Sequence, residues 1–586
     1  MKTFYTEEKH IQILLSLLKE NNIRKVIASP GTQNISLIMS MQNDPFFEVY
    51  SAADERSAAY IACGLSVESG EPVVLSCTGA TASRNYVPGL TEAFYRKIPI
   101  LAITSTQPEK MIGHNIPQVI DRRIQLNDIC KMSIQLSGIN NNADKWNCEI
   151  QINKALIELK RHGGGPIHIN LEAGENDSFS TENLPTVRTI KYINNNKSFP
   201  KILGKKIGIY VGAHKKWDKE LTEIVDRFCE QYNAIVFCDQ TSNYKGKYCA
   251  LMALVAMQEK YSSPCCFVDL LIHIGDISGA YVTINSKETW RINPDGEIRD
   301  TFKNLKYVFE MEEKYFFGYY IDEKINLLQK NSFFEEWNNE YNNILNNISE
   351  LPFSNPWIAK QSSNKLPKDS VLHLGILNSL RSWNYFKIPR SVLGYANTGG
   401  FGIDGNLSSL IGASLSNPNK LFFGIVGDLA FFYDMNSLGN HHVGKNIRIM
   451  LINNGRGTEF RIYSHPAAAF EEATDSYIAA AGHYGNKSSL LVKHYAEDLG
   501  FEYISAKNKE EYLSQMDKFF NSNIGEKPIL FEIFTDSKEE SDAHKIIRNS
   551  IISKKVVAKK MTKIFAKKLL GKKYINIAKK IISIGV

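Results

Sequence analysis

The chain has 586 residues, of which 43% are apolar and 22% charged, values that are ordinary for a globular protein. This length is too great for one hydrophobic core, so three domains are the natural expectation. The net charge of +7 is concentrated in residues 553–586, which hold eleven lysines and no acid and leave the remaining body at about −4. A mildly acidic body of this kind is not typical of a nucleic-acid-binding protein.

The cysteines and the apolar runs indicate where the protein resides. There are nine cysteines, an odd number without CxxC spacing, which indicates reduced, buried thiols and argues against a disulfide framework or a zinc site. The first residues, MKTFYTEEKH, lack the apolar core of a signal peptide. No apolar stretch approaches the roughly 20 residues that cross a bilayer. We therefore expect a cytoplasmic protein.

The first predicted domain covers residues 1–180. KHIQILLSLLKENN predicts an amphipathic helix, which is followed by the strand RKVIAS and the turn PGTQN. DERSAAYIACGLSVESG predicts a second helix, and PVVLSCT, IPILAITS and GPIHINL predict further strands. Strands that alternate with helices indicate a parallel sheet covered on both faces.

Two more α/β domains are expected, at residues 195–335 and 355–540. The strands predicted in them are KIGIYVGA, AIVFCDQ, DLLIHIGD and KYVFEME, and then SVLGYA, LFFGIVGD, IRIMLINN and PILFEIF. The expected fold class is α/β, with three consecutive doubly wound parallel-sheet domains. An enzyme of this class carries its site at the carboxyl ends of the strands.

A basic amphipathic, helical tail is predicted at residues 545–586. Lysine pairs alternate there with apolar clusters at roughly helical spacing. Such a segment suits peripheral contact with an anionic membrane surface. A helix that docks on the body or on a partner subunit, with its lysines solvated, explains the pattern equally well.

Two buried strands of the last domain end in residues suited to a metal ion. The strand GIVGD delivers Asp428, and IRIMLINN delivers Asn454 twenty-six residues later. Mg²⁺ takes oxygen ligands at near-octahedral angles and favours sites that also hold phosphate. A carboxylate, an amide oxygen and a main-chain carbonyl of the next turn would supply three ligands. A strand-end Asp that caps the next helix, followed by an ordinary Asn-Gly turn, is the alternative.

Glu55 opens the predicted helix SAAYIACGLS in the first domain. An acid at the start of a helix is usually a cap that interacts with the helix dipole. A second interpretation is chemically specific. Thiamine diphosphate (ThDP) is activated when a carboxyl group hydrogen-bonds N1′ of its aminopyrimidine, and the cofactor then acts as an electron sink.

The ordered motifs resemble the ThDP enzyme superfamily. They are most similar to the 2-succinyl-5-enolpyruvyl-6-hydroxy-3-cyclohexene-1-carboxylate (SEPHCHC) synthases of menaquinone synthesis, the MenD-like family. The similar stretches cover about residues 10–540 and include SPGTQN, DERSAAYIACGLS, NIPQVID, GPIHIN, WRINPDGEIRD, FGIDG, GIVGDLAFFYDMNSL and LINNGRGTEF. The resemblance implies a pyrimidine-binding domain (1–180), a middle domain (195–335) and a diphosphate-binding domain (355–540).

The resemblance also implies roles for individual residues. Glu55 is the activating carboxylate, and Gln118 lies near the reacting carbon. Mg²⁺ is held by Asp428, Asn454 and the carbonyl of Arg456. The remaining cofactor contacts fall on Pro30, Gly31, Thr81, Asn85, Gly402, Ile403, Gly427, Leu429 and Ala430, where Ile403 props the bent cofactor. Phe460 matches an aromatic residue that lines the substrate pocket.

The sequence departs from the family at the substrate arginines, which hold the carboxylates of 2-oxoglutarate and isochorismate. Gln33, Gln107 and Thr398 stand where arginines are expected, and only Arg381 remains to hold the donor carboxylate. Two further differences are Glu459 in place of an apolar residue and Arg84 in place of a small one. Arg84 either restores one positive charge to the site or forms a surface salt bridge.

These departures favour substrates other than those of SEPHCHC synthase. Each lost charge-assisted pair is worth roughly 1.5–3 kcal/mol, so dicarboxylate binding should weaken by orders of magnitude. We expect a ThDP- and Mg²⁺-dependent decarboxylating carboligase, with a hydroxyl-rich acceptor such as a sugar. SEPHCHC synthase itself, a simple 2-oxo acid decarboxylase and a non-catalytic ThDP-fold binding protein remain alternatives. The resemblance further implies a homodimer or homotetramer with its sites between subunits.

Overall fold

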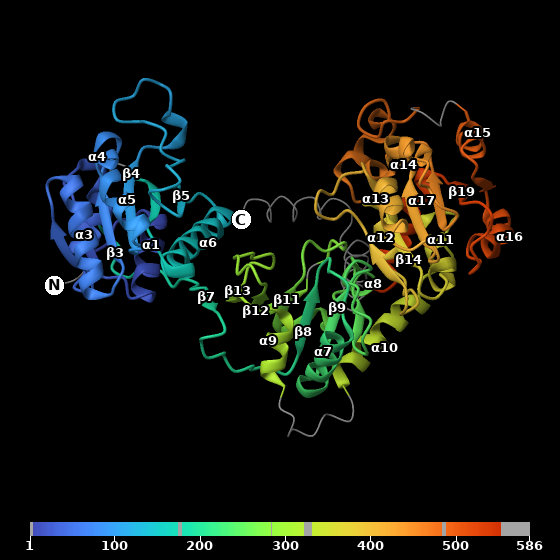
Figure 1. Cartoon of the computed structure of the whole chain (residues 1–586), viewed down its shortest axis with the longest axis horizontal. Coiled ribbons are helices and arrows are strands. Elements are labelled where there is room, and N and C mark those ends of the chain that lie inside the picture. The colour runs from blue at the N-terminus through green and yellow to red at the C-terminus, as the bar shows by residue number, and fades with distance from the viewer. Residues whose placement is uncertain (1–3, 174–177, 283, 322–330, 483–487, 553–586) are drawn as a thin grey trace, which may run out of the picture. The chain divides into compact units, whose positions relative to one another are not determined.

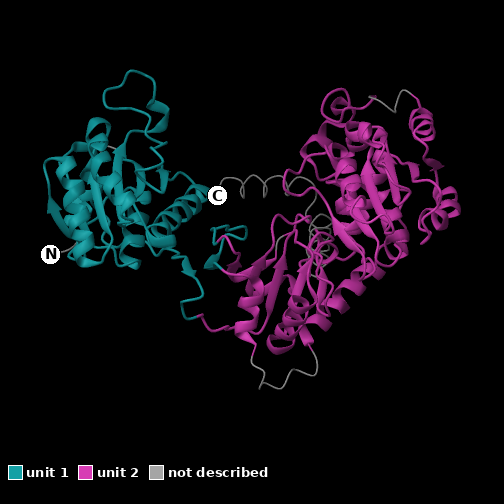
Figure 2. Ribbon diagram, in the orientation of Figure 1, with its two compact units in different colours: residues 1–198, 296–310 teal, residues 199–295, 311–586 magenta. Residues whose placement is uncertain are grey.

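The computed structural model describes the chain apart from residues 1–3, 174–177, 283, 322–330, 483–487 and 553–586. The chain divides into two units (Figure 2). Unit 1 comprises Met1–Ser198 and Gly296–Glu310, and unit 2 comprises Phe199–Asp295 and Met311–Val586. The predicted basic tail lies almost wholly outside the described residues, and the predicted domain boundaries stay predictions.

Unit 1 is built on a six-stranded parallel sheet (Figure 1). Its strands lie in the order β2 (Glu48–Ser51), β1 (Lys25–Ala28), β3 (Val73–Cys77), β4 (Ile100–Thr106), β6 (Ile167–Glu172) and β5 (Met132–Leu136). The chain passes from β1 to β2 on one side of β1 and then crosses to the other side to form β3. β1 therefore lies between β2 and β3, and the direction of the connections reverses there. Such a switch point opens a crevice at the carboxyl ends of the strands.

Helices cover both faces of this sheet, which explains why its central strands are apolar throughout. On one face, α1 (Lys9–Glu20) and α6 (Asn142–Glu158) share a core with Val74 and Leu101. On the other, α3 (Glu55–Ser69) and α5 (Val87–Tyr95) share a core with Val73 and Leu75. Successive strand residues therefore enter opposite cores, as the two-residue period of a strand requires.

Unit 2 contains the second sheet, whose strands there are all parallel. Their order is β10 (Cys249–Leu251), β9 (Ala234–Cys238), β8 (Ile207–Val211), β11 (Phe267–Ile274) and β12 (Asn285–Ile292). The helices α7 (Lys219–Tyr232) and α10 (Ser332–Asn346) pack against β9. In unit 1, β7 (Lys191–Ile193) and β13 (Leu305–Phe309) pair in parallel.

The third sheet, also in unit 2, repeats the topology of the first. Its order is β15 (Leu393–Tyr395), β14 (Val371–Leu374), β16 (Phe422–Gly427), β17 (Ile447–Asn453), β19 (Ile529–Phe534) and β18 (Glu502–Ala506). The switch point here lies between β14 and β16. Three parallel α/β sheets confirm the predicted fold class.

Two further properties bear on the predictions from composition. All nine cysteines are free, and eight of them are buried. No helix in the described part of the chain combines the length and the apolar character that crossing a membrane requires.

Candidate active site

Glu55 is the first residue of α3 in unit 1 and is half-buried. The helix cap is Asp54, whose Oδ2 accepts a hydrogen bond from the Ser57 N–H at 3.1 Å. The capping interpretation therefore applies to Asp54, which leaves the Glu55 carboxylate available for another role. Asn85 Nδ2 donates to Glu55 Oε2 at 3.4 Å, so two predicted cofactor residues lie together.

The other predicted cofactor residues of unit 1 follow two adjacent strands. Pro30 and Gly31 come after β1, and Thr81 lies in α4 (Ala80–Asn85) after β3; all three are exposed. A Cβ on Gly31 would lie 2.7 Å from the Cβ of Thr78. Since that separation is a clash, the two loops approach this closely only because residue 31 is glycine.

The predicted substrate residues of unit 1 lie on the same edge of the sheet or in the loop beyond it. Gln33 is half-buried, and its Oε1 accepts a hydrogen bond from Thr78 Oγ1 at 3.5 Å. Gln107 is half-buried directly after β4. Gln118 is exposed with a φ of 64°, and Arg84 is exposed and forms no ion pair with any described residue.

In unit 2, Asp428 starts α14 (Asp428–Asp434) at the end of β16 and is only 4% exposed. Four main-chain N–H groups donate to its carboxylate: Leu429 to Oδ1 at 2.7 Å, and Asn454, Gly455 and Arg456 to Oδ2 at 3.0, 2.6 and 3.2 Å. The ends of β16 and β17 therefore meet at this carboxylate. The three residues predicted to hold Mg²⁺ lie in one loop cluster.

The electrostatics of this cluster fit a divalent cation. Burial raises the pKa of Asp428 to about 6, against the opposing effect of the main-chain donors. A cation beside the carboxylate would favour its charged form. Asn454 Oδ1 accepts a hydrogen bond from Thr458 Oγ1 at 2.6 Å, which orients a second oxygen of the kind Mg²⁺ prefers.

The described residues include no group of three or more His, Cys, Asp or Glu side chains that could hold a metal. A cation at Asp428 would thus take its remaining ligands from amide and carbonyl oxygens and from a bound diphosphate. Gly427, Leu429 and Ala430, the residues predicted to contact the diphosphate, are the immediate chain neighbours of Asp428.

Gly402 and Ile403 lie in the loop between β15 and α13 (Asn406–Ser414), and Ile403 is half-buried. Asn406 Nδ2 donates to the Ile403 carbonyl at 2.6 Å and holds the loop at the start of the helix. Ser408 in α13 donates through its main-chain N–H and its hydroxyl to Asp434, both at 2.7 Å, which ties α13 to α14. Thr398, earlier in the same loop, is buried.

Arg381, predicted to hold the donor carboxylate, is engaged by an acid of its own chain. Its Nη1 and Nη2 donate to the two carboxylate oxygens of Glu459 at 2.6 and 2.9 Å. Both side chains are largely buried, at 11% and 18% exposure. The next residue, Phe460, packs its ring edge-on against His465 with the centroids 5.3 Å apart. The opposite charges of Arg381 and Glu459, both predicted substrate residues, therefore neutralise each other.

A buried polar network that was not predicted from the sequence adjoins Arg381. Glu540 accepts from Asn378 Nδ2 at 3.1 Å, and Asn378 Oδ1 lies 2.7 Å from His544 Nε2. Burial raises the pKa of Glu540 to about 7 and lowers the pKa of His544 well below its usual value. Glu540 and His544 belong to α17 (Ser537–Arg548), and Asn378 begins α12 (Asn378–Trp383), which also carries Arg381. The four-residue spacing of Glu540 and His544 on α17 was the signal available in the sequence.

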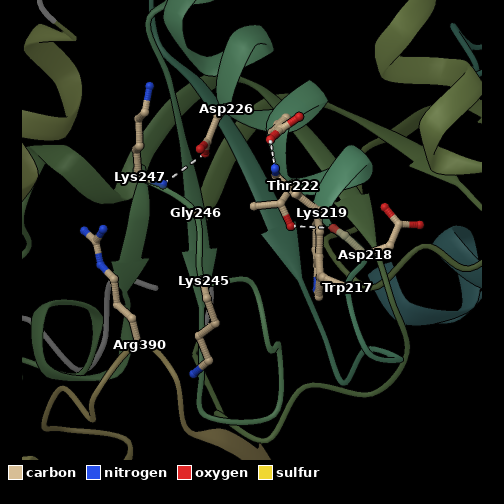
Figure 3. Close-up of a pocket in the computed structure, with 10 residues that line it drawn as sticks. Trp217, Asp218, Lys219, Thr222, Asp226, Lys245, Gly246, Lys247 and Arg390 are labelled. Carbon is tan, nitrogen blue, oxygen red and sulfur yellow. Dashed lines mark hydrogen bonds and ion pairs between the residues drawn. The ribbon is translucent and has the colours of Figure 1, made fainter. Parts of the chain in front are cut away.

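A cavity of about 320 Å³ in unit 2 lies at the start of α7 (Figure 3). Its basic side chains are accompanied by acids: Lys219, Lys245, Lys247 and Arg390 with Asp218, Glu223 and Asp226. None of the predicted site residues lines it.

Comparisons with known proteins agree with this arrangement. Residues 9–125 match the family model described as "Thiamine pyrophosphate enzyme, N-terminal TPP binding domain". The match contains Glu55 and all the predicted unit 1 site residues. The parallel sheets and this match define the class of the protein as a ThDP-dependent enzyme.

Comparison with curated proteins narrows the class to one family. The chain is 30% identical over 568 residues to the SEPHCHC synthase of Bacteroides fragilis, covering 92% of this chain and 98% of that protein. It is 31% identical over 567 residues to the enzyme of the same name from Phocaeicola vulgatus, covering 92% and 97%. For Bacteroides thetaiotaomicron the identity is 30% over 574 residues, with 92% and 98% covered. The chain belongs to the SEPHCHC synthase family.

Proposed function

We propose that the chain is a ThDP- and Mg²⁺-dependent enzyme that decarboxylates a 2-oxo acid and joins the remaining carbon unit to an acceptor. The observation that carries this proposal is the Asp428 loop. A buried carboxylate with a raised pKa, beside an oriented amide oxygen, suits a cation that also binds phosphate oxygens.

Each of the predicted site residues would have a distinct role. Asp428, Asn454 and the Arg456 carbonyl hold the cation, and Ile403 supports the cofactor. When bound, the cofactor supplies an electron sink for the carbon that loses CO₂. Glu55 exchanges a proton with the aminopyrimidine nitrogen, a role for which Asp54 leaves it free by capping α3.

We further propose that the substrates differ from those of the named relatives. The ion pair between Arg381 and Glu459 removes the arginine expected to hold a donor carboxylate. The substrate residues of unit 2 then suit a less anionic acceptor rich in hydroxyl groups, such as a sugar or sugar nucleotide. SEPHCHC synthase activity itself, on 2-oxoglutarate and isochorismate, is the second candidate, favoured by identity along almost the whole of both chains.

We also propose that the protein assembles as a homodimer or homotetramer in the cytoplasm, with each site completed between subunits. We likewise propose that the basic tail makes peripheral contact with the membrane.

The proposal is tested by measuring CO₂ release from a panel of 2-oxo acids, with ThDP and Mg²⁺, in the presence and absence of acceptors. Glu55→Gln should lower turnover by about 10²–10⁴-fold, the usual contribution of a positioned proton-transfer group. Asp54→Asn is the matched control, because asparagine also caps a helix and activity should persist. Undiminished turnover of Glu55→Gln would contradict the assignment. Efficient product formation from 2-oxoglutarate and isochorismate would favour the second candidate.

A further inference from the structure

Arg456, whose carbonyl is predicted to bind the cation, also carries a side chain that ties its loop to another part of unit 2. Its main-chain N–H donates to Asp428 Oδ2 at 3.2 Å. Its Nη1 donates to Oδ2 of Asp475, nineteen residues further along the chain, at 2.6 Å. Residues 454–457, here called the cation loop, are therefore held at Arg456 from two sides. Asp475 was not among the residues predicted from the sequence.

The cation loop depends on such ties because two of its four residues are glycines. Gly455 has a φ of 78°, in the left-handed region, and Gly457 directly follows Arg456. Glycine has more backbone freedom than any other residue, so the loop is not stiff by itself. None of the described residues donates a hydrogen bond to the Arg456 carbonyl, which leaves that oxygen available to a cation. Contacts from outside the loop must therefore fix its direction.

Asp475 lies in a turn, residues 474–481, that is itself firmly held. Thr474 and Ala479 are buried, and the Ala479 N–H donates to the Thr474 carbonyl at 2.8 Å. The Ala479 carbonyl in turn accepts from the Gly457 N–H at 2.6 Å. The turn thus contacts the cation loop twice, through the main chain of Ala479 and through the side chain of Asp475.

A second arginine fixes the other oxygen of Asp475. Arg461 ends the 3₁₀ turn that follows the cation loop, and its Nη1 donates to Asp475 Oδ1 at 3.3 Å. The side chains of Arg456, Arg461 and Asp475 are only 19–28% exposed. Partly buried pairs are screened by salt much less than exposed ones, and a carboxylate held by two arginines cannot rotate freely. Asp475 therefore offers Arg456 a fixed point.

We propose that Asp475 is a positioning residue for the cofactor cation, which acts through the Arg456 side chain to orient the ligand oxygens of the cation loop. Mg²⁺ requires near-ideal octahedral geometry, so a small displacement of one oxygen weakens its binding. Partners that orient metal ligands typically contribute about 10- to 100-fold to metal affinity. The inference rests on the proposed function and adds to it a residue that touches neither the cation nor the substrate.

The binding test is calorimetric titration of Mg²⁺ into the full chain with ThDP in excess, which needs no turnover. Asp475→Asn should weaken Mg²⁺ binding on the order of 10-fold or more. Arg456→Gln should have a similar effect, because the carbonyl stays but the tie is lost. Asp475→Glu keeps the charge and should recover part of the affinity. Glu472→Gln, an exposed acid of the same segment, is the matched control and should bind as wild type.

A double variant separates position from charge. Asp475→Asn also removes a negative charge from the neighbourhood of the cation, whereas Asp475→Asn combined with Arg456→Gln leaves the net charge unchanged. If the two side chains act as one tie, the double variant should bind Mg²⁺ about as weakly as either single variant. Recovery of wild-type affinity in the double variant would overturn the inference, because charge alone would then explain the loss.

A second cation distinguishes positioning from a general loss of stability. Ca²⁺ accepts six to eight oxygen ligands in flexible geometry, whereas Mg²⁺ does not. Asp475→Asn should therefore lower the affinity for Mg²⁺ several-fold more than the affinity for Ca²⁺, both titrated with ThDP in excess. Equal losses for the two cations would contradict a role in orienting ligands.

Failure of the inference and failure of the proposed function give different results. A wild type that binds neither cation together with ThDP would overturn the proposed function and, with it, the inference. A wild type that binds Mg²⁺ and ThDP, with Asp475→Asn binding equally well, would overturn the inference alone. If Asp475→Asn does not fold, Asp475→Glu and Arg456→Gln provide the same comparison.

Discussion

The side chains of Arg381 and Glu459 in unit 2 form an ion pair with two short hydrogen bonds. Replacing Glu459 by glutamine removes the negative charge and frees guanidinium donors for a substrate carboxylate. We expect Glu459→Gln to lower KM for 2-oxo acid donors several-fold, and the initial rate of CO₂ release against donor concentration measures it.

The control for this change is Glu472→Gln, an exposed acid of the following segment, which should leave KM unchanged. The same KM for wild type and Glu459→Gln would show that Arg381 does not approach the donor. The double variant Glu459→Gln/Arg381→Gln should lose the decrease in KM that Glu459→Gln alone produces.

At the residue scale, the sequence could predict positions at strand ends but not the pairings among them. Asp428 and Asn454 were predictable because each directly follows an apolar strand. Arg381 and Glu459 are 78 positions apart, and no sequence pattern around either residue predicts that they pair. Arg122 and Arg123 are the same amino acid in the same loop, and only the folded chain buries one and exposes its neighbour.

At the scale of elements, central strands such as β3, β4, β16 and β17 were predictable from their apolar runs, since both faces of a parallel sheet are covered. The central strands β12, which begins with NSKET, and β14, a short run that contains His373, were missed. The edge strand β2, with the sequence EVYS, was missed because its residues are half-buried or exposed and carry no such run. The same holds for β5 and β18, which alternate buried and half-buried residues at the edge of their sheets.

Among the described residues, helix α17 carries the most fully buried acid. Glu540 has 0% exposure, and burial raises its pKa from 4.5 to about 7. Because the pKa in the folded state lies above that of the unfolded chain, the group adds stability that is complete below pH 4.5 and is lost as the pH rises to about 7. Relative to Glu540→Gln, wild type should lose up to about 3 kcal/mol of unfolding free energy across this range.

Urea unfolding of both proteins at a series of pH values measures this difference. Glu539→Gln, the exposed neighbour in the same helix, serves as the control and should follow the wild-type curve. A difference between wild type and Glu540→Gln that stays constant with pH would show that this carboxyl does not titrate in the range.

At the scale of the whole molecule, the two predicted halves of the cofactor site fall in different units, with Glu55 in unit 1 and Asp428 in unit 2. If sites are completed between subunits, a mixed dimer of Glu55→Gln and Asp428→Ala subunits contains one site with both natural residues. We therefore expect co-expression of the two inactive variants to restore part of the CO₂ release. A mixture as inactive as its components, despite proven mixed dimers, would contradict a site shared between subunits.

The first and third sheets share one strand order, and the substrate residues that the sequence marks as unusual for the family lie outside those strands. Gln33 and Glu459 lie in short 3₁₀ turns, and Gln107 and Thr398 lie in loops. Substitution at such positions leaves the sheets and their cores untouched, so specificity can drift while folding is preserved. The architecture is in this sense evolvable: selection can change the substrate specificity without a compensating mutation that restores the stability of the fold.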